Sequence, residues 1–181
     1  KFDRAKVKGT IAKLFDVLDE STTTALEVIA GGKLYQVVVD SAETGKSLLE
    51  RGQLQKRVTI VPLDKVDGRK AHDAQIKAAE KVSKNEAKLA VSLVTAKDES
   101  VQSVMNYVFG RAFVCQTQET AKKVAFDKNV LLNCVTVEGD LLNPTGLLTG
   151  GSRGSGQSVL KKLKALSEAE ARVDALRKDI E

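Results

Sequence analysis

The stretches VVVDSAETGK (residues 37–46) and FVCQTQETAK (residues 113–122) decide how this 181-residue chain is expected to fold. They align without a gap at a constant offset of 76 residues, so that Lys46 falls on Lys122. Each begins with apolar residues typical of a strand, continues with a residue whose side-chain oxygen can cap a helix, and ends in a short helical pattern. A second apolar run follows each helix. The chain is therefore predicted to contain two related strand–helix–strand units.

The letters GKS at residues 45–47 look like the end of a phosphate-binding loop, G-x-x-x-x-G-K-[ST]. In that motif the first glycine lets backbone N–H groups surround the phosphates. Asp40 occupies this position, and its carboxylate would repel a phosphate. The second unit has Ala121 where the first has the glycine, so we interpret that glycine as an ordinary residue in the first turn of a helix. A nucleotide-binding enzyme that uses Lys46 or the glycines of residues 150–154 is kept as the alternative function.

The composition is that of an ordinary soluble globular protein, with 42% hydrophobic and 29% charged residues. A chain of this length buries enough surface for one sizeable core, or two small lobes, without disulfides or metals. No apolar run approaches the roughly 20 residues of a membrane span, and no secretory leader opens the sequence. We therefore expect a soluble intracellular fragment with no membrane contact.

Few residues could act as metal ligands or nucleophiles. Cys115 and Cys134 lie in apolar, strand-like runs, which favours small buried residues over a disulfide or a metal pair. The single histidine, His72, lies in a polar stretch, so any nucleophile activated by histidine would depend on it alone. One histidine excludes a histidine-rich metal site. We expect no catalytic residue, no metal and no cofactor in this chain.

The expected fold class is α+β, with two related lobes that each have a strand–helix–strand centre, followed by the start of a coiled-coil helix. The predicted boundaries are residues 1–95 for the first lobe, 96–157 for the second and 158–181 for the helix. Strands are expected over residues 7–17, 34–39, 57–63, 112–115 and 133–137, and helices over residues 22–30, 41–51, 73–82, 99–109 and 119–127. Residues 89–96 fit either a buried strand or a helix, because periodicity does not separate the two in a short apolar run.

The C-terminal residues follow a seven-residue repeat. One apolar position is occupied by Val159, Leu166, Val173 and Ile180, and the other by Ala169 and Leu176, with Lys162 as its exception. Charged residues fill many of the remaining positions, which is typical of a coiled coil. Three heptads are marginally stable in water, so the segment is predicted to begin a longer coiled coil. The alternative is a surface helix that packs on its own domain.

The most unusual local sequence is GLLTGGSRGSG, residues 146–156. It lacks the G-x-G-x-x-G of a dinucleotide site. Its letters LTGGS are close to an ATP-cassette signature, which works only opposite an intact phosphate loop. Clustered glycines also let two backbones approach closely, and Leu147 and Leu148 would add apolar contact. We therefore predict a strand edge that pairs with another chain, and a flexible linker is the alternative.

The formal charge of +5 is unevenly placed along the chain. Residues 1–13 contain five basic residues and one acidic residue, and residues 56–70 contain five basic and two acidic residues. Such clusters can contact phosphates, and a solvated basic face is the alternative. Aromatic residues make up only 4% of the chain and tryptophan is absent, so base stacking would add little to nucleic-acid binding.

Several stretches taken together resemble the hinge domain of structural maintenance of chromosomes (SMC) proteins, and within that family the condensin core subunits. The likeness runs over about residues 6–160, and GGSRG combined with AKKVAFDK is its most specific part. The stretches that carry it are TALEVIAGGKLYQVVVD (24–40), LLERGQLQKRVTIVPLDK (48–65), VFGRAFVC (108–115), AKKVAFDK (121–128), VTVEGD (135–140) and PTGLLTGGSRG (144–154).

The resemblance implies a two-lobed domain at the bend of a long antiparallel coiled coil. Such a domain pairs with a paralogous SMC hinge into a ring-like heterodimer, by strand addition between opposite lobes. The ATPase of the family lies in a distant head domain, so this chain would not itself be an enzyme and would take no small-molecule substrate. Family hinges also bind DNA, in some members preferring single strands. The implied role is chromosome condensation in the nucleus, with a cytoplasmic stage in part of the cell cycle.

The resemblance also implies site residues. The dimer interface would comprise Gly146, Leu147, Leu148, Gly150, Gly151, Ser152, Arg153 and Gly154. The candidate nucleic-acid-binding residues are Lys6, Lys8, Lys56, Arg57, Arg69, Lys70, Lys122 and Lys123.

Overall fold

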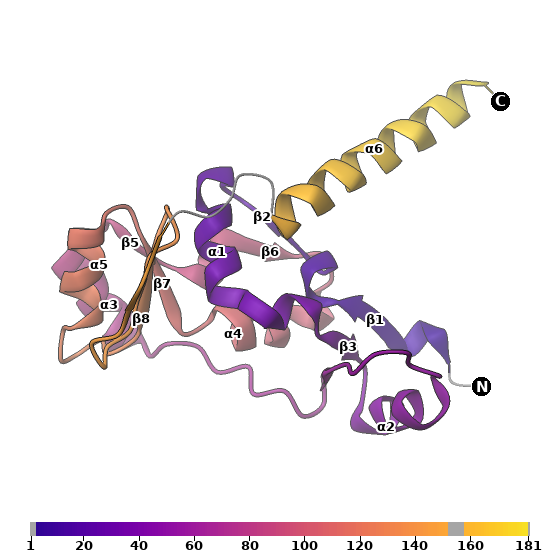
Figure 1. Cartoon of the computed structure of the whole chain (residues 1–181), viewed down its shortest axis with the longest axis horizontal. Coiled ribbons are helices and arrows are strands. Elements are labelled where there is room, and N and C mark those ends of the chain that lie inside the picture. The colour runs from indigo at the N-terminus through magenta and orange to yellow at the C-terminus, as the bar shows by residue number, and fades with distance from the viewer. Residues whose placement is uncertain (1–2, 152–157, 181) are drawn as a thin grey trace.

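The computed structural model of the chain describes residues 3–151 and 158–180 (Figure 1). Two lobes, each with its own β-sheet, form the body, and the long helix α6 (Val159–Ile180) projects from it. This mixture of sheets and helices confirms the predicted α+β class. Within the described ranges, no helix is both long enough and apolar enough to cross a membrane.

The first lobe contains a three-stranded sheet in the order β1-β3-β4. β1 (Val7–Thr10) is antiparallel to β3 (Val37–Val39), and β3 is parallel to β4 (Ile60–Pro62). The crossover helix α2 (Ala42–Arg51) begins where Oγ of Ser41 accepts a hydrogen bond from an N–H three residues later, at 3.3 Å. The glycine of the GKS letters lies buried in the first turn of α2, as predicted for an ordinary helical residue.

The second lobe repeats this unit inside a five-stranded sheet in the order β10-β9-β8-β7-β5. Its parallel strands β7 (Ala112–Cys115) and β8 (Asn133–Thr136) are joined by α5 (Gln118–Ala125), which Thr117 caps as Ser41 caps α2. The prediction of two related strand–helix–strand units is therefore confirmed. The other strands are β5 (Ala87–Leu89), which precedes the lobe boundary predicted at residue 95, and the hairpin of β9 (Leu141–Leu142) and β10 (Leu148–Thr149).

The structural repeat is longer than the two aligned stretches indicate. The letters Asp-Glu-Ser occur at residues 19–21, ahead of α1 (Thr23–Ala30), and at residues 98–100, ahead of α4 (Gln102–Phe109). In both copies the aspartate side chain accepts a hydrogen bond from the serine N–H, at 3.0 Å and 2.8 Å. The Asp-Glu-Ser copies are 79 residues apart, whereas the two aligned stretches are 76 residues apart, so an alignment at a constant offset does not include them. The offset changes because the first copy alone contains the 3₁₀ turn Gly31–Tyr35.

A two-stranded sheet joins the two copies. β2 (Phe15–Val17) precedes the first Asp-Glu-Ser and β6 (Val94–Ala96) precedes the second, and the two strands pair antiparallel. The lobes are thus connected by equivalent elements of the repeat.

Three expectations for secondary structure are wrong. The strand predicted over residues 34–39 begins only at Val37, because the 3₁₀ turn Gly31–Tyr35 includes its first two residues. Residues 7–17 do not form one strand, because the 3₁₀ turn Ile11–Lys13 separates β1 from β2. Residues 89–96 are neither one strand nor one helix, because the 3₁₀ turn Ala90–Leu93 separates β5 from β6. In the turn Ile11–Lys13, the consecutive side chains of Ile11 and Ala12 are both buried in the same core. Consecutive side chains of a strand point to opposite faces, so a strand would not allow this. The predicted helices of the two lobes are all present, as α1, α2, α3 (Asp73–Ser83), α4 and α5.

Two hydrophobic clusters fill the interior. The first contains residues of α1 and α4, and in it the rings of Phe15 and Phe109 meet edge to face with their centroids 5.1 Å apart. The second combines residues of the five-stranded sheet with residues of α3 and α5. Cys115 and Cys134 are fully buried there as free thiols, and a hydrogen bond with Cys115 together with burial raises the pKa of Cys134 well above its ordinary value. Both cysteines serve as small core residues, as predicted.

The two ends of α6 have different surroundings. Leu160 is buried, and Leu163 packs against the first cluster. Further along, Leu166, Val173 and Leu176 are 50%, 46% and 56% exposed. Exposed apolar side chains on a projecting helix agree with the predicted start of a coiled coil (Figure 1).

Candidate strand-pairing interface

The segment predicted to be an interface contains β10, the outermost strand of the five-stranded sheet. In the part of the chain that the structure describes, no strand lies on its outer side. The N–H of Asn143 donates to the C=O of Leu147 at 2.9 Å, and Leu148 lies opposite Leu142. Because bonded and non-bonded positions alternate along an antiparallel pair, the N–H and C=O of Leu148 point to the free side. Leu147 and Leu148 are 69% and 56% exposed.

The glycines around β10 have roles within the chain itself. Gly146, with φ of 97°, lies in the turn between β9 and β10, and Gly151 has φ of 131°, a region that other residues rarely adopt. A Cβ on Gly150 would collide with the carboxylate of Asp140. These glycines therefore shape the strand edge, and their participation in an interface stays a prediction. Ser152, Arg153 and Gly154 of the predicted interface lie outside the described residues.

The first lobe has a free edge of its own along β4. The N–H of Val37 in β3 donates to the C=O of Thr59 at 2.9 Å. Alternate residues of a strand face the same neighbour, so the N–H and C=O of Ile60 point away from β3. The nitrogen of Pro62 has the same orientation as that of Ile60, and a proline without an N–H is compatible with a free edge.

Comparison of the two copies shows that the β4 edge is the place where the second lobe carries another strand. The equivalent of β4 is β8, and its corresponding side is covered by the antiparallel strand β9. No strand among residues 3–151 covers β4 in this way. Leu49 of α2 and Leu54, in the segment between α2 and β4, are 60% and 40% exposed. Each lobe thus ends in an unpaired edge accompanied by exposed leucines.

The candidate nucleic-acid-binding residues do not gather on one surface. α2 and α5 lie at opposite ends of the body, so the residues near them are far apart (Figure 1). The structure places Lys6 and Lys8 at the start of the first lobe, Lys56 and Arg57 between α2 and β4, Arg69 and Lys70 ahead of α3, and Lys122 and Lys123 in α5.

Three of these basic residues have carboxylate partners. The guanidinium of Arg69 donates to both oxygens of Asp67, with Nε 2.9 Å from Oδ1 and Nη2 2.6 Å from Oδ2. This contact lowers the pKa of Asp67 and raises the pKa of Arg69 from their ordinary values. Surface pairs of this kind add little to stability, although they reduce the positive charge that a phosphate meets. The other pairs are Lys123–Glu119, at 2.7 Å, and Lys8–Asp98, at 3.7 Å.

Arg69 and Lys70 share a cavity with a residue that was not predicted from the sequence. Arg111 forms part of the wall of this cavity, which has a volume of about 380 Å³ and lies at the start of α3. The N–H of Ala71 donates to the C=O of Gly110 at 2.7 Å and so holds the connecting segment beside Arg111. No spacing in the sequence indicates this grouping, because it depends on the path of the connection between the lobes.

Comparison with known proteins gives a consistent family. A model described as the flexible hinge domain of SMC proteins matches residues 4–125. Structural maintenance of chromosomes protein 2-1 of Arabidopsis thaliana is 52% identical over 178 residues, which cover 98% of this chain and 15% of that protein. Structural maintenance of chromosomes protein 2 of Homo sapiens is 45% identical over 170 residues, which cover 93% of this chain and 14% of that protein. The chain therefore spans about 15% of the length of such relatives.

Solved structures share the fold. An asymmetric dimer of the Geobacillus stearothermophilus SMC hinge domain matches with a TM-score of 0.76 at 25% identity, covering 97% of this chain and 70% of that chain. The folded elbow of cohesin matches with a TM-score of 0.77 at 23% identity, covering 99% of this chain and 25% of that chain, which is a likeness of fold alone.

Proposed function

Because the chain belongs to the family of SMC flexible hinge domains, we propose that it is a pairing module that joins a paralogous SMC hinge through the edges of β10 and β4. One observation carries this function: the two lobes each have an unpaired edge at which one residue directs both its N–H and its C=O outward. The Geobacillus hinge was solved as a dimer, which supports pairing between hinges. Similarity to SMC protein 2 supports a condensin-type partner and a role in chromosome condensation in the nucleus.

Leu148 and Ile60 are matched as pairing partners. A bonded position of an antiparallel pair needs an N–H and a C=O from both residues, and each of these two residues offers both. Pro62 offers a carbonyl but no N–H, so only a few hydrogen bonds can form between β4 of one hinge and β10 of the other. The exposed leucines beside both edges supply apolar area that a short ladder lacks. Since each hinge has one edge of each kind, two hinges in opposite orientation form two joints and close a ring.

Replacement of Leu148 tests this pairing. Leu148→Pro removes the outward N–H, whereas Leu148→Ala keeps it and shortens only the side chain. We expect the proline variant to bind the paralogous hinge at least tenfold more weakly than the alanine variant, or about 1.4 kcal/mol, because a donor is lost and the ring obstructs the incoming strand. Calorimetry and light scattering of the mixed hinges measure this difference.

Thermal unfolding of each variant alone is the control for folding. Both should unfold close to the unsubstituted chain, because the N–H of Leu148 has no partner within the hairpin. Equal affinities of two folded variants for the partner would contradict pairing through β10.

We also propose that the chain contacts DNA through the basic group of Arg69, Lys70 and Arg111. The cavity that these three basic side chains line together with Asp73 has room for a phosphate, and the N-terminal N–H groups of α3 lie at the same place. The basic side chains outnumber the one carboxylate in its wall. Contacts of this type read the DNA backbone and not the bases, so we expect little sequence preference.

A further inference from the structure

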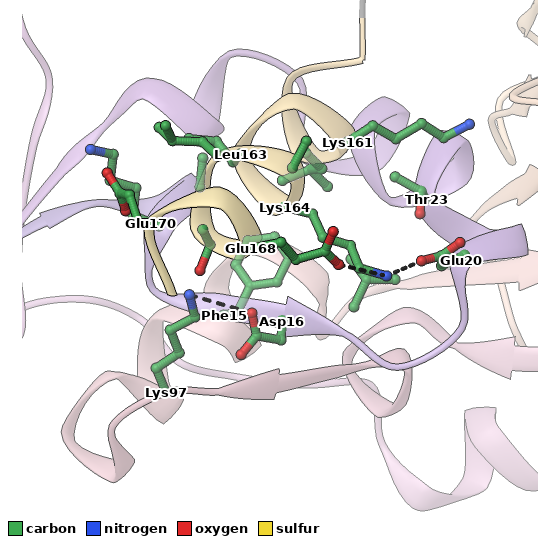
Figure 2. A pocket seen from close by; sticks show the side chains of 17 residues that line it. Phe15, Asp16, Glu20, Thr23, Lys97, Lys161, Leu163, Lys164, Glu168 and Glu170 are labelled. Atoms are coloured by element: carbon green, nitrogen blue, oxygen red, sulfur yellow. Dashed lines mark hydrogen bonds and ion pairs between the residues drawn. The ribbon is translucent and has the colours of Figure 1, made fainter. Parts of the chain in front are cut away.

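Helix α6 leaves the body above a hollow. The hollow has a volume of about 790 Å³ and lies between the first turns of α6 and the segment formed by the 3₁₀ turn Ile11–Lys13 and β2. Figure 2 shows Phe15 among the side chains that line it, together with an ion pair between Asp16 and Lys97 at 3.3 Å. The helix is therefore not packed along its whole inner side.

The beginning of α6 is fixed to α1 by one carboxylate. Oε1 of Glu27 accepts hydrogen bonds from the N–H of Leu160, at 2.7 Å, and from Oγ of Ser158, at 2.8 Å. Oγ of Ser158 in turn accepts a hydrogen bond from the N–H of Lys161, at 3.1 Å. A negative charge at the N-terminal end of a helix is stabilised by the helix dipole, and Leu160 is buried beside it. This end of α6 is thus both capped and anchored in the core.

A weaker contact holds α6 one turn further along. Lys164 forms an ion pair with Glu20, which lies just ahead of α1 (Figure 2). Its Nζ is also 4.0 Å from Oε1 of Glu168 in the same helix. The side chains of Lys164 and Glu20 are 55% and 73% exposed, so water and salt screen their attraction. Beyond Lys164, no hydrogen bond or ion pair among the described residues joins α6 to the body.

We propose that Glu27 is a pivot about which α6 turns as a rigid arm, and that the Glu20–Lys164 ion pair is a latch that holds the arm in the observed direction. A firm anchor at the end of the helix, a weak contact one turn away and a hollow on one side are what such a motion requires. Both latch residues line the hollow, so when the latch opens, α6 is free to turn about Glu27 within that space. The direction of the arm then depends on ionic strength and on the charge of residue 164. This inference is independent of the proposed pairing through β10.

Distance measurements between two spin labels test the pivot and the latch separately. Labels attached to cysteines introduced at Asp174 on α6 and Lys128 on the second lobe report the direction of the arm. We expect the native cysteines to stay unlabelled, because both are fully buried. We expect one narrow distance distribution in the unsubstituted chain at about 0.05 M salt. We expect Lys164→Ala to shift its centre, because the latch is removed and the pivot remains. We expect Glu27→Ala to broaden it, because the helix loses its anchor.

Salt and a distant substitution provide the controls. At about 1 M salt, charges are screened within about 3 Å. Raising the salt to this concentration should shift the centre of the distance distribution in the unsubstituted chain and leave the distribution of Lys164→Ala unchanged. The distance distribution of Glu43→Ala, a change of an exposed residue on α2, should be the same as that of the unsubstituted chain. If Glu27→Ala does not fold, Glu27→Gln replaces it, since it keeps an acceptor oxygen without the charge. Distributions that are the same in all variants and at both salt concentrations would overturn the proposal.

Discussion

Gly45 and Ala121 occupy the same place in two copies of one structural unit. Ala121 is fully buried, and a Cβ added to Gly45 would lie 3.3 Å from Cγ2 of Ile60. Lys46 beside it is 77% exposed and lies 3.9 Å from Glu50 on the outer side of α2. The role of Gly45 could be predicted because the sequence contains its own comparison, an alanine at the equivalent position. The Asp-Glu-Ser caps were missed although their letters are identical, because the 3₁₀ turn of the first copy changes the offset.

Replacing Gly45 by alanine should stabilise the chain by about 0.5–1 kcal/mol, which is the usual gain for this change inside a helix. The new methyl group is close to Ile60, but Ile60 is only half-buried at a free edge and can shift by the small distance needed. Chemical denaturation of the monomeric chain measures the change. The matched control is Gly146→Ala, which should lower stability because φ at that position is 97°. A loss of stability in Gly45→Ala would mean that β4 cannot adjust and that the two copies are not equivalent here.

The first turns of α6 pack against the body, whereas its later turns are exposed. Its heptad pattern predicted a coiled coil, with Lys162 as an exception, and the structure explains the exception. In the first turns, the buried Leu160 and the half-buried Leu163 pack against the body, and neither is at a heptad position. The position of Lys162 therefore faces solvent. The pattern of exposed apolar residues begins only at Leu166. The free edges of β4 and β10 could not be predicted in this way, because the order of strands in a sheet is not encoded in their own apolar patterns.

Hydrogen exchange should divide α6 into two parts. Amides of residues 161–166 should be protected nearly as well as the core, because this part of the helix is anchored by Glu27 and Leu160. Amides of residues 170–177 should exchange orders of magnitude faster, because an isolated helix of this length is marginal in water. Mass spectrometry of exchanged peptides measures both parts in one experiment. Uniform protection along α6 would show that the exposed stripe is already covered, for example by a second copy of the chain.

At the scale of the whole molecule, the lobes are two copies of one unit that differ at their edges. The second copy continues into β9 and β10, whereas the first stops at β4, and this difference leaves one edge of each kind free. Charge is distributed less regularly. The sequence predicted which segments are basic, but only the path of the connection between the lobes brings Arg111 to Arg69 and Lys70. The remaining predicted basic residues lie in other parts of the body, so a net charge of +5 does not by itself define a binding surface.

Neutralising Lys70 and Arg111 together should therefore weaken binding of single-stranded DNA more than an equal change of charge elsewhere. Each phosphate contact releases counterions, so the slope of log K against log salt should fall in magnitude by about 1.4 in Lys70→Gln/Arg111→Gln. The matched control is Lys77→Gln/Lys81→Gln, two exposed lysines of α3 outside this cavity, which removes the same charge. Fluorescence anisotropy over a series of salt concentrations measures both slopes. Equal losses in the two variants would mean that DNA responds to the total charge of the chain, and the cavity beside α3 would then not be its phosphate site.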